Sequence, residues 1–303
     1  MSGERPRIAF IGLGRMGEPM AECLLRAGYH VTGQDAVPGR AAAFAVRTGA
    51  EAVATPADAI AAADAIITML PSSKEVAQVI EQSLHAFQDG QLLLEMSSGA
   101  PATTRHLGTL VSPRGVAMID APVSGGVSRA KDGTLAIMAG GEDQDLDRAT
   151  PILQAMSTTI HRVGGLGAGQ AMKALNNMVS AAGFLAGIEA LLIGQRFGLD
   201  PARMVDVLNA STGMTNSSQK KFKQFVLSRR FDSGFGLDLM LKDLGIAVDL
   251  ARQTETAVPL SSHTRELAAA AVAQLGHGRD HTEFARLSEL LAGTELKARE
   301  NLP

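Results

Sequence analysis

Apolar positions in the first half of the chain form short β-branched runs, separated by stretches of helical length with apolar residues three and four positions apart. The runs predict strands, and the stretches between them predict helices. The predicted strands are Ile8–Ile11, His30–Gln34, Ala52–Val53, Ala65–Met69, Leu92–Met96, Val116–Asp120, Leu135–Ala139 and Thr159–Arg162. The predicted helices are Met16–Ala27, Gly39–Arg47, Pro56–Ala61, Ser73–Ser83, Ala102–Val111 and Asp143–Ala155. This alternation predicts an α/β fold with a doubly wound, mainly parallel sheet.

The pattern changes after Arg162, because no convincing strand follows. Helices are predicted near residues 169–197, 201–209, 217–227, 237–253, 260–275 and 283–299. A glycine-rich turn at residues 163–169 marks the change. We therefore expect a sheet-containing N-terminal domain over residues 1–164 and an all-helical C-terminal domain over residues 165–303, joined by a long interdomain helix.

Composition excludes several classes of function. The 303 residues are 46% apolar and 19% charged, which is typical of a globular protein. The net charge is −3 and basic residues cover no whole face, so neither nucleic acid nor a membrane surface is an expected partner. Cys23 is the only cysteine, which rules out an internal disulfide. No apolar signal region precedes the first strand, so a cytoplasmic location is expected.

A glycine motif, Gly12-Leu13-Gly14-Arg15-Met16-Gly17, follows the first predicted strand at once. Gly12 permits a tight turn, Gly14 lets the backbone approach a pyrophosphate, and Gly17 lets the helix pack closely on the sheet. The pyrophosphate is expected at the helix N-terminus, where free N–H groups and the helix dipole favour an anion. Between a first strand and a first helix, this motif predicts a dinucleotide-binding site.

The second predicted strand is followed by an acidic residue, Asp35, at the offset expected for the group that holds the adenosine ribose hydroxyls. A carboxylate there repels a 2′-phosphate, and the next residue is Ala36 rather than an arginine. We therefore expect NAD as the cofactor in preference to NADP. Arg40, one helical turn further on, is the residue that could still reach a phosphate.

Lys173 is the main candidate for catalysis. Lys173 and Glu189 are the only charged residues between Gln170 and Gln195, where the chain is otherwise almost entirely apolar. A lysine in the first turn of such a helix is disfavoured in its charged form by burial and by the helix dipole, which lowers its pKa. It could then exchange a proton near neutral pH. The alternative is a lysine that extends from a core helix to solvent.

Polar loops follow other predicted strands at their C-terminal ends, where ligands bind in open α/β sheets. Ser124 offers a hydroxyl, and Gly125 and Gly126 can direct successive backbone N–H groups toward a carboxylate. Gly-rich turns of this composition are also common without any function. The remaining two loops are Met69-Leu70-Pro71-Ser72 and Met96-Ser97-Ser98.

In combination and order, these motifs resemble those of the β-hydroxyacid dehydrogenase family over essentially the whole chain. The cofactor motif begins at Gly12, the substrate motif runs from Asp120 to Gly126, and the catalytic motif runs from Gly167 to Asn177. A late motif is Lys242-Asp243-Leu244. Departures from the family pattern are Glu95 in place of the more usual Asp and Ile246 in place of Leu, and neither is expected to affect the chemistry.

The resemblance implies a Rossmann-type N-terminal domain and a specific set of roles. Lys173 resembles the catalytic lysine, Asn177 the residue that orients the substrate, and Ser124 a catalytic and carboxylate-binding residue. Gly125 and Gly126 would complete the carboxylate loop. Implied cofactor contacts are Met69, Leu70, Pro71, Ser98 and Lys242, in addition to the glycine motif and Asp35. No metal is implied.

The predicted function is hydride transfer between NAD and a small 3-hydroxy acid or its semialdehyde, such as 3-hydroxyisobutyrate or glycerate and tartronate semialdehyde. The hydroxyl-rich segment at residues 211–219 favours a substrate with an extra hydroxyl. Alternatives are an imine reductase of the same fold, a non-catalytic dinucleotide-binding scaffold and a 6-phosphogluconate dehydrogenase. Lys173 argues against the first two, and the short chain against the last.

A homo-oligomer, dimer or tetramer, is also expected. The helical half carries more apolar residues than one core should need, which usually indicates an interface. The candidate interface residues are Phe184, Leu185, Leu191, Leu192 and Ile193.

Overall fold

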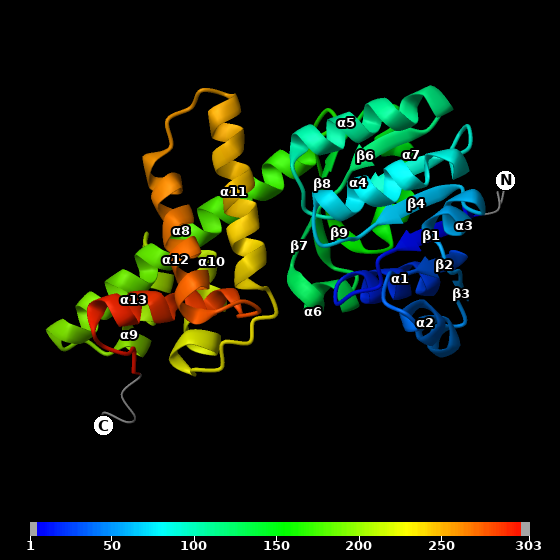
Figure 1. Cartoon of the computed structure of the whole chain (residues 1–303). Coiled ribbons are helices and arrows are strands. Elements are labelled where there is room, and N and C mark those ends of the chain that lie inside the picture. The colour runs from blue at the N-terminus through cyan, green and yellow to red at the C-terminus, as the bar shows by residue number, and fades with distance from the viewer. Residues whose placement is uncertain (1–4, 298–303) are drawn as a thin grey trace. The chain divides into compact units, whose positions relative to one another are not determined.

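The computed structural model describes residues 5–297 and forms two compact units, Met1–Lys173 and Ala174–Pro303 (Figure 1). The division falls within one long helix, α8 (Ala168–Phe197), which begins in the first unit and continues into the second. The domain limits 1–164 and 165–303 therefore stay a prediction.

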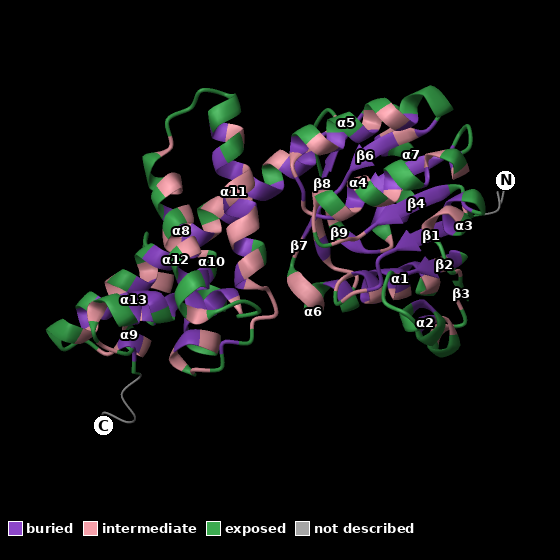
Figure 2. Ribbon diagram, in the orientation of Figure 1, coloured by how far each residue is buried: buried purple, intermediate pink, exposed green. Residues whose placement is uncertain are grey.

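The first unit contains a sheet whose central strands are short, parallel and wholly buried (Figure 2). The strand order is β3-β2-β1-β4-β5-β6-β8-β7, with β9 paired to β8. β1 therefore lies where the order reverses, which is the position at which doubly wound sheets bind ligands. The strands are β1 (Ile8–Ile11), β2 (Val31–Gln34), β3 (Glu51–Ala52), β4 (Ala65–Thr68), β5 (Leu92–Glu95), β6 (Ala117–Asp120), β7 (Val123–Ser124), β8 (Leu135–Gly140) and β9 (Ser157–Gly164).

Side chains alternate along these strands between two apolar layers. Phe10 and Ile67 pack in one cluster with residues of α1 (Gly17–Arg26). Ile11 and Ile66 pack in the other with residues of α4 (Ser73–Gln82) and α5 (Pro101–Val111). Crossover connections supply the helices that cover the two faces. The helices of this unit are α1 (Gly17–Arg26), α2 (Arg40–Thr48), α3 (Pro56–Ala61), α4 (Ser73–Gln82), α5 (Pro101–Val111), α6 (Gly126–Lys131) and α7 (Asp143–Gln154), with 3₁₀ turns at Leu84–Ala86 and Ser112–Arg114.

The second unit is helical throughout its described part. Its core contains the edge-to-face pair Phe184 and Phe222, with ring centroids 5.5 Å apart. After α8 come α9 (Pro201–Asn209), α10 (Asn216–Lys220), a π-helical turn (Phe222–Leu227), α11 (Leu237–Gln253), α12 (Pro259–Leu275), a 3₁₀ turn (His281–Glu283) and α13 (Phe284–Ala292). The prediction of strands followed by helices alone is thus confirmed.

Several predicted element limits were wrong. The helix expected at 217–227 is interrupted at Lys221, and the helix expected at 283–299 ends at Ala292, where Gly293 adopts φ +61°. Residues 298 and 299 of that prediction lie outside the described part of the chain. Ser124, expected in a loop, lies in β7 and pairs with Ala136 of β8.

The proposed interface residues on α8 also require correction. Phe184, Leu185, Leu191 and Leu192 are at most 5% exposed, because they fill the core of the second unit. Ile193 alone of the five is exposed, at 71%. Within residues 5–297, one helix, Ala168–Phe197, is long and apolar enough to cross a membrane, by length and composition only, as is true of some core helices that never meet a membrane.

Candidate cofactor and catalytic site

The turn after β1 has the geometry expected of a dinucleotide motif. Gly12 has φ +101°, and a Cβ there would lie 2.3 Å from the carbonyl oxygen of Met69. A Cβ on Gly17 would lie 1.8 Å from the carbonyl oxygen of Gly12. Both positions therefore exclude any side chain. At Gly14, by contrast, a Cβ would meet no atom within 4 Å, so this glycine is not required by packing within the chain.

Packing within the chain does not explain a glycine at position 14. The open space there fits the close approach of a bound pyrophosphate to the backbone. The helix that follows, α1, has Met16 at its N-cap and no side-chain cap. The Glu18 N–H donates to the Gly14 carbonyl oxygen at 3.1 Å and Pro19 has no N–H, so an anion here would be bound by the backbone N–H groups of residues 14–17. The residues present therefore fit a dinucleotide at the C-terminal edge of β1.

Asp35 directly follows β2 and lies beside the glycine turn. Its side chain is 7% exposed and accepts hydrogen bonds from the backbone N–H groups of Leu13 and Val37, each at 2.8 Å. The Arg40 guanidinium lies 3.2 Å from Asp35 Oδ1. Arg40 stood out in the sequence as a group that could reach a 2′-phosphate, and the structure places it directly on the carboxylate that would repel that phosphate.

Two neighbouring strand ends approach the same region. The Leu70 N–H after β4 donates to Ser97 Oγ after β5, at 2.9 Å. Ser72 caps α4 through the Lys74 N–H at 3.2 Å. The two loops that carry the predicted cofactor contacts are thus connected across adjacent strands, and those contacts, Met69, Leu70, Pro71 and Ser98, are all at least partly exposed.

The candidate carboxylate loop begins in β7 and continues into α6. Gly125 has φ +137° at the N-cap of α6, and Gly126 has φ +70° in a place where a Cβ would meet no atom within 4 Å. These left-handed conformations favour glycine. Ser124 is half-buried beside them. The loop can therefore present a hydroxyl and backbone N–H groups to a small anion.

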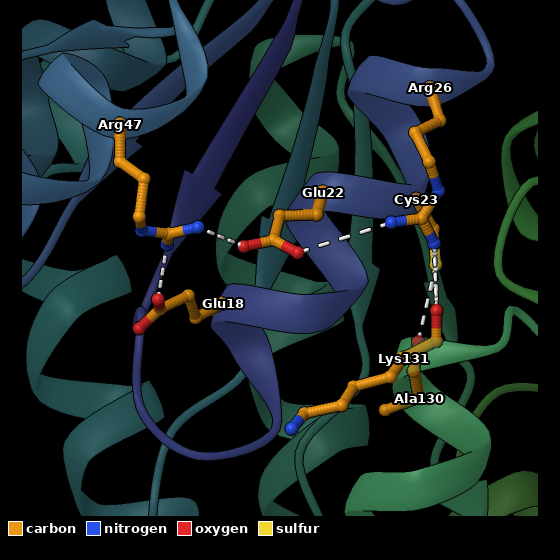
Figure 3. A network of polar contacts seen from close by, with 7 residues as sticks. All are labelled: Glu18, Glu22, Cys23, Arg26, Arg47, Ala130 and Lys131. Carbon is orange, nitrogen blue, oxygen red and sulfur yellow. Dashed lines mark hydrogen bonds and ion pairs between the residues drawn. The ribbon is translucent and has the colours of Figure 1, made fainter.

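A polar network holds α6 against the dinucleotide helix (Figure 3). Arg26 of α1 donates to the carbonyl oxygen of Lys131 at 2.8 Å, and the Cys23 thiol to that of Ala130 at 3.2 Å. On the other side of α1, Arg47 of α2 pairs with Glu22 and Glu18. Cys23 is buried, as predicted, and burial raises the pKa of its thiol. The helix that follows the carboxylate loop is thus fixed to the helix that follows the glycine motif.

Two acidic residues, Glu95 and Asp120, lie side by side at the ends of β5 and β6, where they are register partners. Both are at most 2% exposed. Asp120 Oδ1 accepts the Gly167 N–H and Oδ2 accepts the Gln170 N–H, each at 2.7 Å. Asp120 thereby caps the start of α8 from a distant strand. Glu95 accepts a hydrogen bond from the side-chain amide of Gln170.

Burial dominates the ionisation of both carboxyls. It raises the pKa of Glu95 to about 8, an effect to which the Asp120 charge adds and which a hydrogen bond from Ser97 opposes. Burial raises the pKa of Asp120 to about 6, although the N–H groups of Gly167 and Gln170 lower it. Glu95 Oε1 has no hydrogen-bond partner among the described residues, which agrees with a neutral carboxyl. In the sequence, Glu95 is a departure from the family pattern with no expected effect on the chemistry. In the structure, it is hydrogen-bonded to Gln170 of α8, the helix that carries Lys173.

Lys173 is the sixth residue of α8, because the helix begins at Ala168. It lies in the second turn, not in the first as expected, so the helix dipole acts on it less than the sequence suggested. Lys173 is 8% exposed. Asn177 follows one turn later on the same face, about 6 Å along the axis, and is 6% exposed.

Asn177 is hydrogen-bonded to Asp243, a residue of the late motif to which no role was assigned from the sequence. Its Nδ2 donates to Asp243 Oδ2 of α11 at 2.5 Å, while Asp243 Oδ1 lies 3.3 Å from Lys242 Nζ. Asp243 is 1% exposed. The place of Asp243 directly after Lys242 in the late motif was the available signal. Asp243 therefore joins the candidate amide and the candidate cofactor lysine in the second unit.

The hydroxyl-rich segment 211–219 does not present all its hydroxyls to a ligand. Ser218 Oγ accepts the Thr215 N–H at 2.8 Å, and Thr215 Oγ1 accepts the Ser218 N–H at 3.0 Å, forming a capping box for α10. Ser217 and Ser218 are at most 2% exposed. The polarity of this segment thus has a structural cause, and it no longer favours a substrate with an extra hydroxyl.

The fold and the glycine turn define a dinucleotide-binding oxidoreductase. Sequence profiles specify the class: residues 7–165 match the NAD binding domain of 6-phosphogluconate dehydrogenase, and residues 167–288 match the NAD-binding domain of NADP-dependent 3-hydroxyisobutyrate dehydrogenase. The chain belongs to the β-hydroxyacid dehydrogenase family.

Individual relatives are similar in sequence to this chain over most of their length. The 2-(hydroxymethyl)glutarate dehydrogenase of Eubacterium barkeri is 34% identical over 264 residues, covering 86% of this chain and 87% of the relative. The mitochondrial 3-hydroxyisobutyrate dehydrogenase of Mus musculus is 36% identical over 276 residues, covering 88% and 82%. A solved structure of Mycobacterium tuberculosis 3-hydroxyisobutyrate dehydrogenase with L-serine superposes with a TM-score of 0.87 at 34% identity, covering 95% of this chain and 99% of that one.

Proposed function

We propose that this protein transfers a hydride between NAD and a small 3-hydroxy acid or its semialdehyde, with Lys173 as the general acid and base. The observation that carries the proposal is the polar face of α8. Lys173 and Asn177 lie there one turn apart, both are almost fully buried, and Asn177 is fixed by a buried carboxylate. Buried polar groups on a largely apolar helix are costly unless the site uses them.

A bound NAD would supply the acceptor for the hydride that leaves the hydroxyl-bearing carbon of the substrate. Lys173, as the neutral amine, takes the hydroxyl proton, so that the C–O single bond becomes a carbonyl. In the reductive direction, the ammonium returns that proton to the carbonyl oxygen. Asn177 donates to or accepts from the same oxygen, and Asp243 fixes its amide orientation.

The substrate carboxylate is assigned to Ser124, Gly125 and Gly126. The hydroxyl and the backbone N–H groups of this loop supply hydrogen-bond donors without a full positive charge, which suits reversible binding of a small anion. 3-Hydroxyisobutyrate and related 3-hydroxy acids carry a carboxylate for this loop and a hydroxyl for Lys173, and relatives with such names support the class.

NAD is proposed as the cofactor in preference to NADP, because the Asp35 carboxylate lies at the end of β2. Arg40 pairs with that carboxylate and is the group that could tolerate a 2′-phosphate. Measurement of kcat/KM with both cofactors tests the preference. Asp35→Ala should narrow it, since the variant removes the repulsion and leaves Arg40 available. A wild-type preference for NADP would refute the proposal and would mean that Arg40 or another residue captures the 2′-phosphate.

A panel of three- to five-carbon hydroxy acids with NAD and NADP tests the reaction. Lys173→Ala should reduce kcat by about 10²–10⁴-fold, the usual contribution of a general acid–base group. NADH binding, followed by direct excitation of NADH in this tryptophan-free chain, should persist. Lys74→Ala on α4 removes an exposed lysine and serves as the matched control. Near-normal turnover of the Lys173 variant would refute the role.

Two further proposals concern the oligomeric state and the location of the protein in the cell. We expect a homo-oligomer, now on the basis of apolar side chains that remain exposed at Val179, Ile193 and Phe197 of α8, at 68%, 71% and 84%. We also expect the protein in the cytoplasm.

A further inference from the structure

Gln170 is a buried glutamine whose side chain joins separate segments of the first unit. It is 1% exposed. Its amide oxygen accepts the Gly99 N–H at 2.8 Å, and its amide nitrogen donates to the carbonyl oxygen of Ser97 at 2.8 Å and to the Glu95 carboxyl. Both N–H groups and the carbonyl are therefore engaged. A rotated amide would face like groups, so its orientation is fixed.

These contacts connect two segments that the proposed reaction uses. Ser97 and Gly99 flank Ser98 in the loop after β5, which is assigned to the cofactor. Gln170 itself lies in the first turn of α8, three residues before Lys173. Its backbone N–H is also held, by Asp120 at 2.7 Å. The Gln170 side chain thus joins the cofactor loop directly to the start of the helix that carries Lys173.

We propose that Gln170 is a positioning residue that fixes the loop at residues 97–99 against the first turn of α8 and so sets the place of Lys173. Its catalytic consequence rests on the proposed role of Lys173. No other side chain supplies the same contacts, because asparagine is too short and a carboxylate cannot donate to both Ser97 and Glu95.

Gln170→Met removes the hydrogen bonds and keeps the length of the side chain. Small misplacement of reacting groups is expensive, so kcat should fall by about 10–100-fold. The KM for NAD should rise as well, since Gln170 holds the backbone of the loop that is assigned to the cofactor. With substrate deuterated at the hydride-bearing carbon, the isotope effect on kcat should increase, because hydride transfer becomes slower relative to the other steps.

Gln91 provides a matched control at the opposite end of β5. It is a buried glutamine with three comparable bonds, from its amide nitrogen to the carbonyl oxygens of Ile60 and Ala63 at 2.7 and 2.8 Å, and to its amide oxygen from Gln88 N at 2.8 Å. Gln91→Met should lower thermal stability by a similar amount. It should leave kcat and the isotope effect at wild-type values.

Gln170→Glu gives a variant whose bonds depend on pH. The protonated acid can donate from one oxygen and accept the Gly99 N–H on the other, whereas the carboxylate would face the Ser97 carbonyl and Glu95. The groups around it that titrate or carry charge are Glu95 and Asp120. The ratio of its kcat to that of wild type should therefore rise as pH falls from about 9 to about 6. The Met variant should show no such recovery.

Hydrogen exchange provides a readout that needs neither substrate nor cofactor. Gln170→Met should accelerate amide exchange in both residues 97–104 and 165–175, and Gln91→Met in neither. Absence of NAD- or NADP-dependent turnover in the wild type would refute the proposed function, and the exchange data would still decide whether Gln170 joins the two segments. If the wild type is active and Gln170→Met retains its kcat, isotope effect and exchange pattern, the positioning role is refuted.

Discussion

Glu95→Gln provides a direct test of the buried carboxyl pair, because it removes one ionisable group and keeps the shape of the side chain. The folded-state pKa of Glu95 is raised from 4.5 to about 8 by burial. The folded protein therefore binds more protons than the unfolded chain over this interval. The stabilisation is fully present below pH 4.5 and is lost as pH rises through about 8.

The magnitude follows from that interval. Each pH unit within it lowers the free energy of unfolding by about 1.4 kcal/mol. Asp120, whose pKa is about 6, contributes mainly at lower pH. As pH rises from about 6 to about 8.5, the free energy of unfolding of the wild type should thus fall by roughly 2–3 kcal/mol relative to that of Glu95→Gln. At the lower pH, the variant should be no more stable than the wild type, because its extra amide N–H lacks a partner.

Chemical denaturation followed by far-UV circular dichroism suits this chain, which has no tryptophan and a single tyrosine. Calorimetry should accompany it, because two units can unfold separately. Glu81→Gln on α4 removes an exposed carboxyl and should keep the wild-type dependence on pH. A constant difference between Glu95→Gln and wild type across this range would show that Glu95 ionises without cost in the folded state, and the argument from burial would fail.

Three further predictions concern the cofactor turn, the carboxylate loop and the proposed interface. Gly14→Ala should fold normally, because its Cβ meets no atom, yet weaken NADH binding by about tenfold or more, whereas Gly17→Ala should fail to fold stably; equal NADH affinity in Gly14→Ala and wild type would contradict the pyrophosphate assignment. Ser124→Ala should raise the substrate KM more than it lowers kcat in steady-state kinetics, since its hydroxyl binds ground and transition states alike; unchanged KM would remove it from the site. Light scattering should give a mass above 31.6 kDa that Ile193→Asp lowers, and a wild-type monomer at micromolar concentration would refute the oligomer.

Local patterns were sufficient for the order of the elements and for the dinucleotide turn. Strand and helix periods depend on neighbouring residues, so the alternation in the first half was visible without tertiary information. The spacing of Gly12, Gly14 and Gly17 was equally informative, because the motif is contiguous in sequence, although the atom that excludes a side chain at Gly12 belongs to Met69 after β4. The family motifs, which depend on residue order, led to the class that the relatives confirm.

The faces of α8 could not be predicted in the same way. A helix that is apolar on nearly all sides has no periodic signal to show which side meets the core. Four of the five residues assigned to an interface are therefore core residues, and only Ile193 is exposed. The predicted start of the helix, residue 169, lies within one residue of the observed start, Ala168, but Lys173 lies in the second turn and not in the first.

The polar support of the candidate site was decided by tertiary structure alone. Glu95, Asp120 and Gln170 are far apart in the sequence, and parallel strand pairing places the first two side by side beneath the start of α8. Asp243 reaches Asn177 in a comparable way from α11. The sequence identified residues that act through their own local geometry, whereas residues that act by holding another segment became visible only when the folded chain brought the two together.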